Sequence, residues 1–200
     1  MKDLGKKFQE TIWVSKSLFE RNKTSGSSAN ISFRDNDKIY ISGSGTCFGI
    51  LEKKDFAITT LDGTTISDIK PSKELSLHLA LYNKSDKIQA VIHTHSLYST
   101  LWSILKHKNE DDIIANITPY LQMKVGKISL IKYFPPGSKE LFAEMKKRIN
   151  SGDGFLLQNH GSIVGGESIM EAFFGLEELE ESAKISWFIR LLGKDEYNHI

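Results

Sequence analysis

The chain lacks the features that mark secreted, membrane-spanning and nucleic-acid-binding proteins. It has a single cysteine, Cys47, so no internal disulfide can form. It shows no signal-peptide pattern and no run of about 18 apolar residues, so no membrane span is predicted. The formal net charge is +1 without a block of arginine or lysine, which removes the electrostatic signature of a nucleic-acid binder. We therefore expect a protein of the reducing cytoplasm, with Cys47 buried as a small apolar residue and with small anions as candidate partners.

The composition is that of one ordinary globular domain. Hydrophobic residues make up 40% of the chain and charged residues 26%, which suits a sizeable core under a normal polar surface. No linker, internal repeat or low-complexity tract divides the sequence. We expect one domain over residues 1–200.

Two histidines follow a run of apolar β-formers. Residues 90–92 lead into His93 and His95, and because successive strand residues point to opposite faces, both imidazoles should leave on the same side. Such a pair makes half of a metal site, since catalytic zinc takes three protein ligands and keeps one position open. A packed or exposed histidine pair is the alternative. A second β-like run, residues 154–158, also ends near a histidine, His160, which is the natural third ligand.

Two loops of small or polar residues flank a predicted β-hairpin. The loops cover residues 24–30 and 42–46, and the hairpin arms cover 31–34 and 38–41. Loops without bulky side chains expose backbone N–H groups and hydroxyls, the donors that cradle a phosphate. The hairpin brings its two outer ends together, which favours an anion site. Ordinary flexible loops are the alternative.

Glu74 lies where the sequence predicts the first turn of a helix. Residues 71–74 open a helix that runs to about Tyr82, with Ser72 as its N-cap. A helix N-terminus favours anions, and a glutamate there is also simply favourable with the helix dipole. On its own, Glu74 therefore does not indicate catalysis.

The remaining elements are predicted from periodicity and turn signals. Further helices are expected over residues 3–23, 96–105 and 139–150 and after a capping box at Ser168 and Glu171, and strands over 56–60, 64–66, 154–158 and 163–165. Residues 113–133 alternate short apolar runs with Pro119 and Gly126, which fits strands with turns. The acidic run 177–181 is interpreted as a solvated helix face. His199 lies in a tail that we expect to fray.

Five motifs, in order, resemble the class II aldolase and adducin superfamily. They are Ser-Ala-Asn-Ile-Ser-x-Arg at 28–34, Ser-Gly-Ser-Gly at 42–45, Pro-Ser-x-Glu at 71–74, His-Thr-His-Ser at 93–96 and Gln-Asn-His-Gly at 158–161. The resemblance covers essentially the whole chain. It implies an α/β fold of three α/β/α layers with a central, mainly antiparallel sheet, usually assembled as a homotetramer with sites at subunit interfaces.

The resemblance also implies roles for particular residues. His93, His95 and His160 would bind Zn²⁺ or another divalent ion such as Mn²⁺ or Co²⁺. Glu74 would be the acid/base and would also ligate the metal when substrate is absent. The implied phosphate site consists of Ser28, Ala29, Asn30, Ser44, Gly45, Ser72 and Lys73. Tyr120 matches a position where the family can bring a tyrosine to a neighbouring subunit's site, although a packed aromatic after Pro119 is the alternative.

Several stretches resemble one branch of the superfamily, the 3-oxo-tetronate 4-phosphate decarboxylases, more closely than fuculose-1-phosphate aldolase. They are residues 26–30, 70–74, 117–120, 133–137 and 177–184. This resemblance implies a metal-dependent reaction that releases CO2 and leaves dihydroxyacetone phosphate through a metal-bound enediolate. Glu74 would protonate C2, a step that suits a carboxyl with a raised pKa.

Two other classes of function stay open. An aldolase acting on a ketose phosphate makes the same enediolate by expelling an aldehyde, so the metal ligands alone do not separate the two reactions; an epimerase or dehydratase is a more distant possibility. The third class is a non-catalytic domain like the adducin head, against which the retention of three histidines and Glu74 argues. We expect a lyase of carbohydrate metabolism that acts on a phosphorylated sugar acid or ketose, with neither nucleic acid nor membrane as partner.

Overall fold

The centre of the fold is a seven-stranded sheet. The computed structural model describes residues 2–193, so Met1 and residues 194–200, which include His199, lie outside the described part. The strands are β1 (Asn30–Asp35), β2 (Lys38–Ser42), β3 (Phe56–Thr60), β4 (Ala90–Thr94), β5 (Ile128–Ile131), β6 (Gly154–Leu157) and β7 (Gly161–Gly166). Their order is β3-β2-β1-β4-β7-β6-β5, and every neighbouring pair except β5 and β6 is antiparallel. The predicted mainly antiparallel sheet is confirmed.

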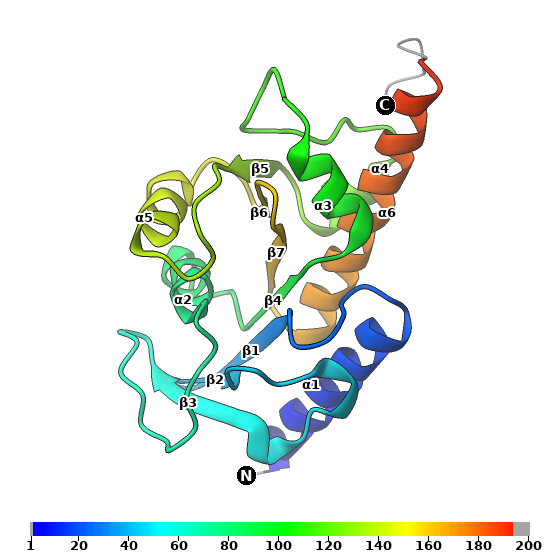
Figure 1. The fold of residues 1–200 in the computed structure, drawn as a ribbon. Helices are drawn as coiled ribbons and strands as arrows, with labels where there is room; N and C mark the ends of the chain where they lie inside the picture. The colour runs from blue at the N-terminus through cyan, green and yellow to red at the C-terminus, as the bar shows by residue number, and fades with distance from the viewer. Residues whose placement is uncertain (1, 194–200) are drawn as a thin grey trace.

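Helices cover both faces of this sheet (Figure 1). They are α1 (Lys2–Glu20), α2 (Leu75–Lys84), α3 (Leu97–Ile104), α4 (Pro119–Lys124), α5 (Lys139–Arg148) and α6 (Ile169–Leu191), with 3-10 turns η1 (Phe48–Ile50) and η2 (Lys53–Asp55). Helices α1, α3, α4 and α6 lie on one face, and α2 and α5 lie on the other. The three α/β/α layers predicted from the resemblance are therefore present.

Strand alternation divides the apolar residues between two cores. Phe33 and Ile92 belong to the cluster under α1 and α6, whereas Val91 and Phe155 belong to the cluster under α2 and α5. Since side chains two residues apart share a face, His93 lies on the same side as Val91, facing the α2 layer.

Helix α2 begins later than predicted. Pro71 and Ser72 stay extended because Pro71 forms a β-bridge with Gly43, and the Ser72 N–H donates to the carbonyl of Ser42 at 3.2 Å. The N-cap is therefore Glu74 and not Ser72, whose Oγ accepts a hydrogen bond from the Glu74 N–H at 3.3 Å. Because the helix begins later, the Glu74 carboxyl lies at the N-terminus of α2, beside His93 near the end of β4.

Three further predictions are wrong in detail. The segment 113–133 contains the helix α4 as well as strand β5, because Pro119 at the first helical position is suited to starting a helix. Cys47 is partly exposed and not buried. The second arm of the hairpin at 64–66 is reduced to a single bridge between Thr59 and Thr65. Among the helices of residues 2–193, we find none with both the length and the apolar character needed to cross a membrane.

Candidate metal centre and anion pocket

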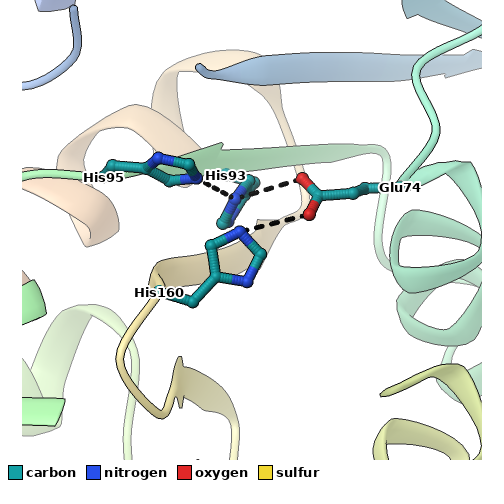
Figure 2. A group of neighbouring side chains, drawn as sticks. All are labelled: Glu74, His93, His95 and His160. Atoms are coloured by element: carbon teal, nitrogen blue, oxygen red, sulfur yellow. Dashed lines mark hydrogen bonds and ion pairs between the residues drawn. The ribbon is translucent and has the colours of Figure 1, made fainter. Parts of the chain in front are cut away.

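Four side chains from three segments of the chain converge at one end of β4. Figure 2 shows Glu74, His93, His95 and His160 pointing toward one another, and one ligand atom from each lies within 4.8 Å of the others. His93 Nε2 is 3.0 Å from His95 Nε2 and 3.2 Å from Glu74 Oε2. Glu74 Oε1 is 3.2 Å from His160 Nε2. The structure thus brings together all four residues expected to hold a metal.

His160 reaches this cluster from the turn between β6 and β7. Asn159 adopts a left-handed φ of 56°, which turns the chain sharply. A Cβ at Gly161 would collide with the carbonyl oxygen of Thr94, so only glycine allows β7 to approach the end of β4 this closely. The Asn-His-Gly sequence therefore has a structural reason: it holds His160 beside His95.

The environment keeps His93 and His95 neutral, as metal ligands must be. Burial lowers the pKa of His93 to about 3 and the pKa of His95 to about 4, outweighing the attraction of the Glu74 carboxylate. His93 Nδ1 lies 2.8 Å from the carbonyl oxygen of Ser162, so the Nδ1–H donates there and the Nε2 lone pair faces the cluster.

Glu74 is ionised in this arrangement. Burial by itself raises the pKa of its carboxyl, but the opposing effect of His93, His160 and a hydrogen bond from Asn30 is larger, and the pKa falls below its ordinary value. Glu74 therefore enters the reaction as a carboxylate.

The donor set fits a divalent ion. Glu74 Oε1 and both ring nitrogens of His160 are buried without a hydrogen-bond partner in the described structure. Unsatisfied buried polar atoms are costly, about 1–3 kcal/mol each. Three imidazoles and a carboxylate are the ligands that zinc and similar ions prefer, and an ion among them would satisfy Glu74 Oε1 and one ring nitrogen of His160.

A cavity of about 210 Å³ opens beside the cluster. Its lining includes Glu74, His95 and His160. All the residues expected to bind phosphate also line it, namely Ser28, Ala29, Asn30, Ser44, Gly45, Ser72 and Lys73. A larger cavity of about 560 Å³ lies by Trp102 and Arg190, but the described residues that line it include no comparable group of metal-ligating side chains. The metal-ligating side chains therefore identify the smaller cavity as the candidate active site.

The loops offer hydrogen-bond donors to this cavity. The backbone N–H groups of Ser28, Ser44 and Ser72 donate within the fold. Those of Ala29, Gly45 and Lys73 have no partner within residues 2–193. Gly45 has a φ of 81°, a conformation that suits glycine. The positive charge of Lys73 also acts on His95, which places a cation near the cluster. A phosphate is the kind of anion these groups can bind.

The sequence analysis did not identify Glu180 as a residue that positions the metal centre. Glu180 of α6 is only 3% exposed, so interpreting the whole acidic run as a solvated face is wrong. Its carboxylate accepts hydrogen bonds from the N–H groups of Tyr98 and Ser99, at 3.0 and 2.8 Å, and from the Ser99 hydroxyl at 2.7 Å. It thus caps α3, which starts two residues after His95, in place of the Ser96 side chain. Its burial could have been predicted from its position on the apolar stripe of α6, four residues after Leu176 and three before Ala183.

Tyr120 lies apart from the cavity of its own chain. Its side chain on α4 is 57% exposed and does not line the cavity. The alternative of a packed aromatic is therefore wrong within this chain. A contribution to a neighbouring subunit stays a prediction.

Comparison with known proteins identifies the family. Residues 9–187 match the family model described as the class II aldolase and adducin N-terminal domain, and the chain belongs to this family. It is 36% identical to 3-oxo-tetronate 4-phosphate decarboxylase of Haemophilus influenzae, covering 97% of this chain and 91% of the relative. It is 39% identical to L-fuculose phosphate aldolase of Methanococcus maripaludis, covering 92% of this chain and 97% of that relative.

Solved structures confirm the predicted fold. YgbL of Klebsiella pneumoniae, for which aldolase, epimerase and decarboxylase activities are all named as candidates, superimposes with a TM-score of 0.91 at 32% identity, covering 98% of this chain and 93% of that one. An L-fuculose 1-phosphate aldolase superimposes with a TM-score of 0.85 at 28% identity, covering 96% and 90%. The family resemblance and the three-layer fold are thus confirmed.

Proposed function

We propose that this protein is a metal-dependent lyase that decarboxylates 3-oxo-tetronate 4-phosphate to dihydroxyacetone phosphate and CO2. The observation that carries the proposal is a Glu-His-His-His cluster opening directly into a small cavity with unpartnered backbone donors. The named decarboxylase relative and the matching stretches of sequence favour a sugar-acid phosphate as the substrate.

The phosphate of the substrate binds among the small-residue loops. The N–H groups of Ala29, Gly45 and Lys73 supply donors there, and the Lys73 ammonium adds positive charge. Glu74, His95 and His160 line the same cavity as the loops, so a phosphate bound at the loops would leave the carbon skeleton of the substrate beside Glu74. The volume of about 210 Å³ suits a small molecule of this size.

His93, His95 and His160 would hold the divalent ion, with Glu74 completing the set before substrate binds. We propose zinc, with Mn²⁺ and Co²⁺ as alternatives, since imidazole suits all of these ions. When bound, the ion acts as a Lewis acid that stabilises negative charge on the oxygens of the substrate.

Glu74 delivers the proton that the product requires. The bond from C2 to the carboxylate breaks, CO2 leaves, and both electrons stay on C2, delocalised toward the C3 oxygen. One proton must then reach C2 to give dihydroxyacetone phosphate. Because Glu74 starts ionised, it first takes up a proton through the cavity and then delivers it to C2.

The second candidate is an aldolase that cleaves a ketose phosphate to dihydroxyacetone phosphate and an aldehyde. The 39% identity to the archaeal L-fuculose phosphate aldolase favours it. The same residues serve both reactions, because each leaves an electron pair next to the carbonyl carbon. Only the group that departs differs.

A direct comparison of substrates separates the two candidates. The metal-loaded protein is incubated in parallel with 3-oxo-tetronate 4-phosphate and with L-fuculose 1-phosphate, and kcat/KM is measured for each. The proposal predicts a clear preference for the acid. Comparable or greater efficiency on fuculose 1-phosphate would transfer the assignment to the aldolase.

We further propose a cytoplasmic homotetramer in which Tyr120 reaches the site of a neighbouring subunit. Tyr120 and Met123 on α4 are 57% and 74% exposed, an apolar pair that a second subunit could cover. Light scattering coupled to size exclusion tests the assembly. A monomer at micromolar concentration would contradict it.

A further inference from the structure

Two buried titratable side chains on the inner face of α2 have no part in the chemistry described so far. His78 and Tyr82 are fully or almost fully buried, and Ser32 of β1 lies between them. The Ser32 Oγ is 2.7 Å from His78 Nδ1 and 2.7 Å from the Tyr82 hydroxyl. On the other side of the ring, His78 Nε2 is 2.5 Å from Asn30 Oδ1. Asn30 in turn contacts Glu74 Oε2 through Nδ2, at 3.0 Å.

These contacts form one continuous series of hydrogen bonds. The chemistry of the groups determines which one donates and which one accepts at each contact. An ionised carboxylate only accepts, so Asn30 must turn its NH2 toward Glu74 and its carbonyl oxygen toward His78. His78 then donates from Nε2, which leaves Nδ1 as an acceptor in the neutral ring. Ser32 therefore donates to Nδ1 and accepts from Tyr82. Every hydrogen bond from Tyr82 onward points toward Glu74.

The opposite direction is unfavourable at the link that joins Asn30 to Glu74. A flipped Asn30 amide would place its carbonyl oxygen against the Glu74 carboxylate, so that two acceptors face each other. Burial lowers the pKa of His78 to about 3, so the ring stays neutral and retains its acceptor nitrogen at neutral pH. All the groups concerned are buried, so water cannot easily replace a lost partner.

We propose that His78, Ser32 and Tyr82 are positioning residues that hold the Asn30 side-chain amide in the one orientation that donates to Glu74. The carboxylate is thereby fixed between the histidines and the cavity. The kinetic consequence of this inference rests on the proposed function, whereas the hydrogen-bond order itself does not. Misplacing a reacting group by about 1 Å can cost about 100-fold in rate, so the order of this chain bears on catalysis.

The first test observes the hydrogen-bond order directly. Nitrogen-15 NMR of the histidine rings, on the full chain loaded with zinc, reports which nitrogen of His78 carries the proton. The inference predicts a neutral ring protonated at Nε2 and unprotonated at Nδ1. A proton on Nδ1, alone or with Nε2, would overturn it, and this result is independent of whether the protein decarboxylates anything.

The second test measures the kinetic consequence with a matched set of variants. His78→Leu should lower kcat by about 10- to 100-fold with a smaller change in KM, because Glu74 is misplaced while the backbone donors of Ala29, Gly45 and Lys73 stay in place. His78→Gln retains a donor for Asn30 and should recover much of the loss, and Tyr82→Phe should have a smaller effect than His78→Leu. Bound metal per chain should stay at the wild-type value in all three.

The control variant is Leu81→Ala, in the same helix and equally buried but outside the chain of hydrogen bonds. It should lower Tm while leaving kcat close to wild type. Equal losses of kcat in Leu81→Ala and His78→Leu, or no recovery in His78→Gln, would show that His78 has only a structural role. If His78→Leu does not fold, Tyr82→Phe and the NMR measurement still decide. Absence of decarboxylation in the wild type would contradict the proposed function and leave the NMR test standing.

Discussion

Glu180 offers a sharp test of how the scaffold holds the metal centre. It sits on α6 and accepts three hydrogen bonds from the start of α3. Capping of a helix N-terminus contributes about 1–2 kcal/mol, and hydrogen bonds to an ionised acceptor about 1.5–3 kcal/mol each. Because water can reach part of the freed helix end, we expect Glu180→Ala to lower the free energy of unfolding by about 3 kcal/mol. Glu180→Gln, which presents an NH2 group to one of the donors, should cost about 1–2 kcal/mol.

The same substitution should weaken metal binding. His95 lies two residues before α3, so a loosened helix start would displace its imidazole. We expect the metal Kd to rise about tenfold or more, the size of effect found for groups that support ligands. Urea denaturation gives the stability, and competition with a chromophoric chelator gives the Kd.

Glu178, two residues before Glu180 on α6, provides a matched control. Glu178 on the same helix makes no ion pair or hydrogen bond in the described structure, so Glu178→Gln should change stability by no more than about 0.5 kcal/mol. The reasoning would be refuted if Glu180→Ala were as stable as Glu178→Gln, or if it lost stability without any change in metal affinity.

Four further predictions concern the site itself. His95→Ala should abolish metal binding and activity while the fold persists by circular dichroism; full metal occupancy in the variant would remove His95 from the ligand set. Glu74→Gln should keep the metal and lose turnover, and near wild-type kcat would exclude Glu74 as the acid/base. Gly161→Ala should lower both Tm and metal affinity because of the collision with Thr94, whereas an unchanged Kd would contradict the close approach described above. In metal-free protein, stability should fall as the pH drops below about 6.5, since His93 and His95 then take up protons in the unfolded chain but not in the folded one; a urea midpoint that is flat from pH 7 to 5 would argue against buried neutral histidines.

The ligand histidines could be predicted because the information is local. His93 and His95 are separated by one residue at the end of an apolar strand, and strand alternation alone puts them on one face. His160 could be predicted in the same way, because it follows another apolar run. Even the loops of the anion pocket are recognisable by their small residues.

Other features depend on contacts that no local pattern records. The late start of α2 follows from the bridge between Pro71 and Gly43, which is a tertiary contact. The burial of Glu180 depends on the packing of α6 against α3, and its acidic neighbours concealed it. The lowered pKa of Glu74 depends on side chains brought together from three distant segments. Local propensity gave way to tertiary structure in each case.

The most direct test of the account is a product balance on one substrate. Metal-loaded protein is given 3-oxo-tetronate 4-phosphate in deuterated water, and CO2 and dihydroxyacetone phosphate are quantified together. The account predicts equal amounts of both products, with one solvent deuteron on the carbon that lost CO2, and loss of both products in Glu74→Gln. Neither product from wild-type protein with its metal in place would contradict the decarboxylase assignment.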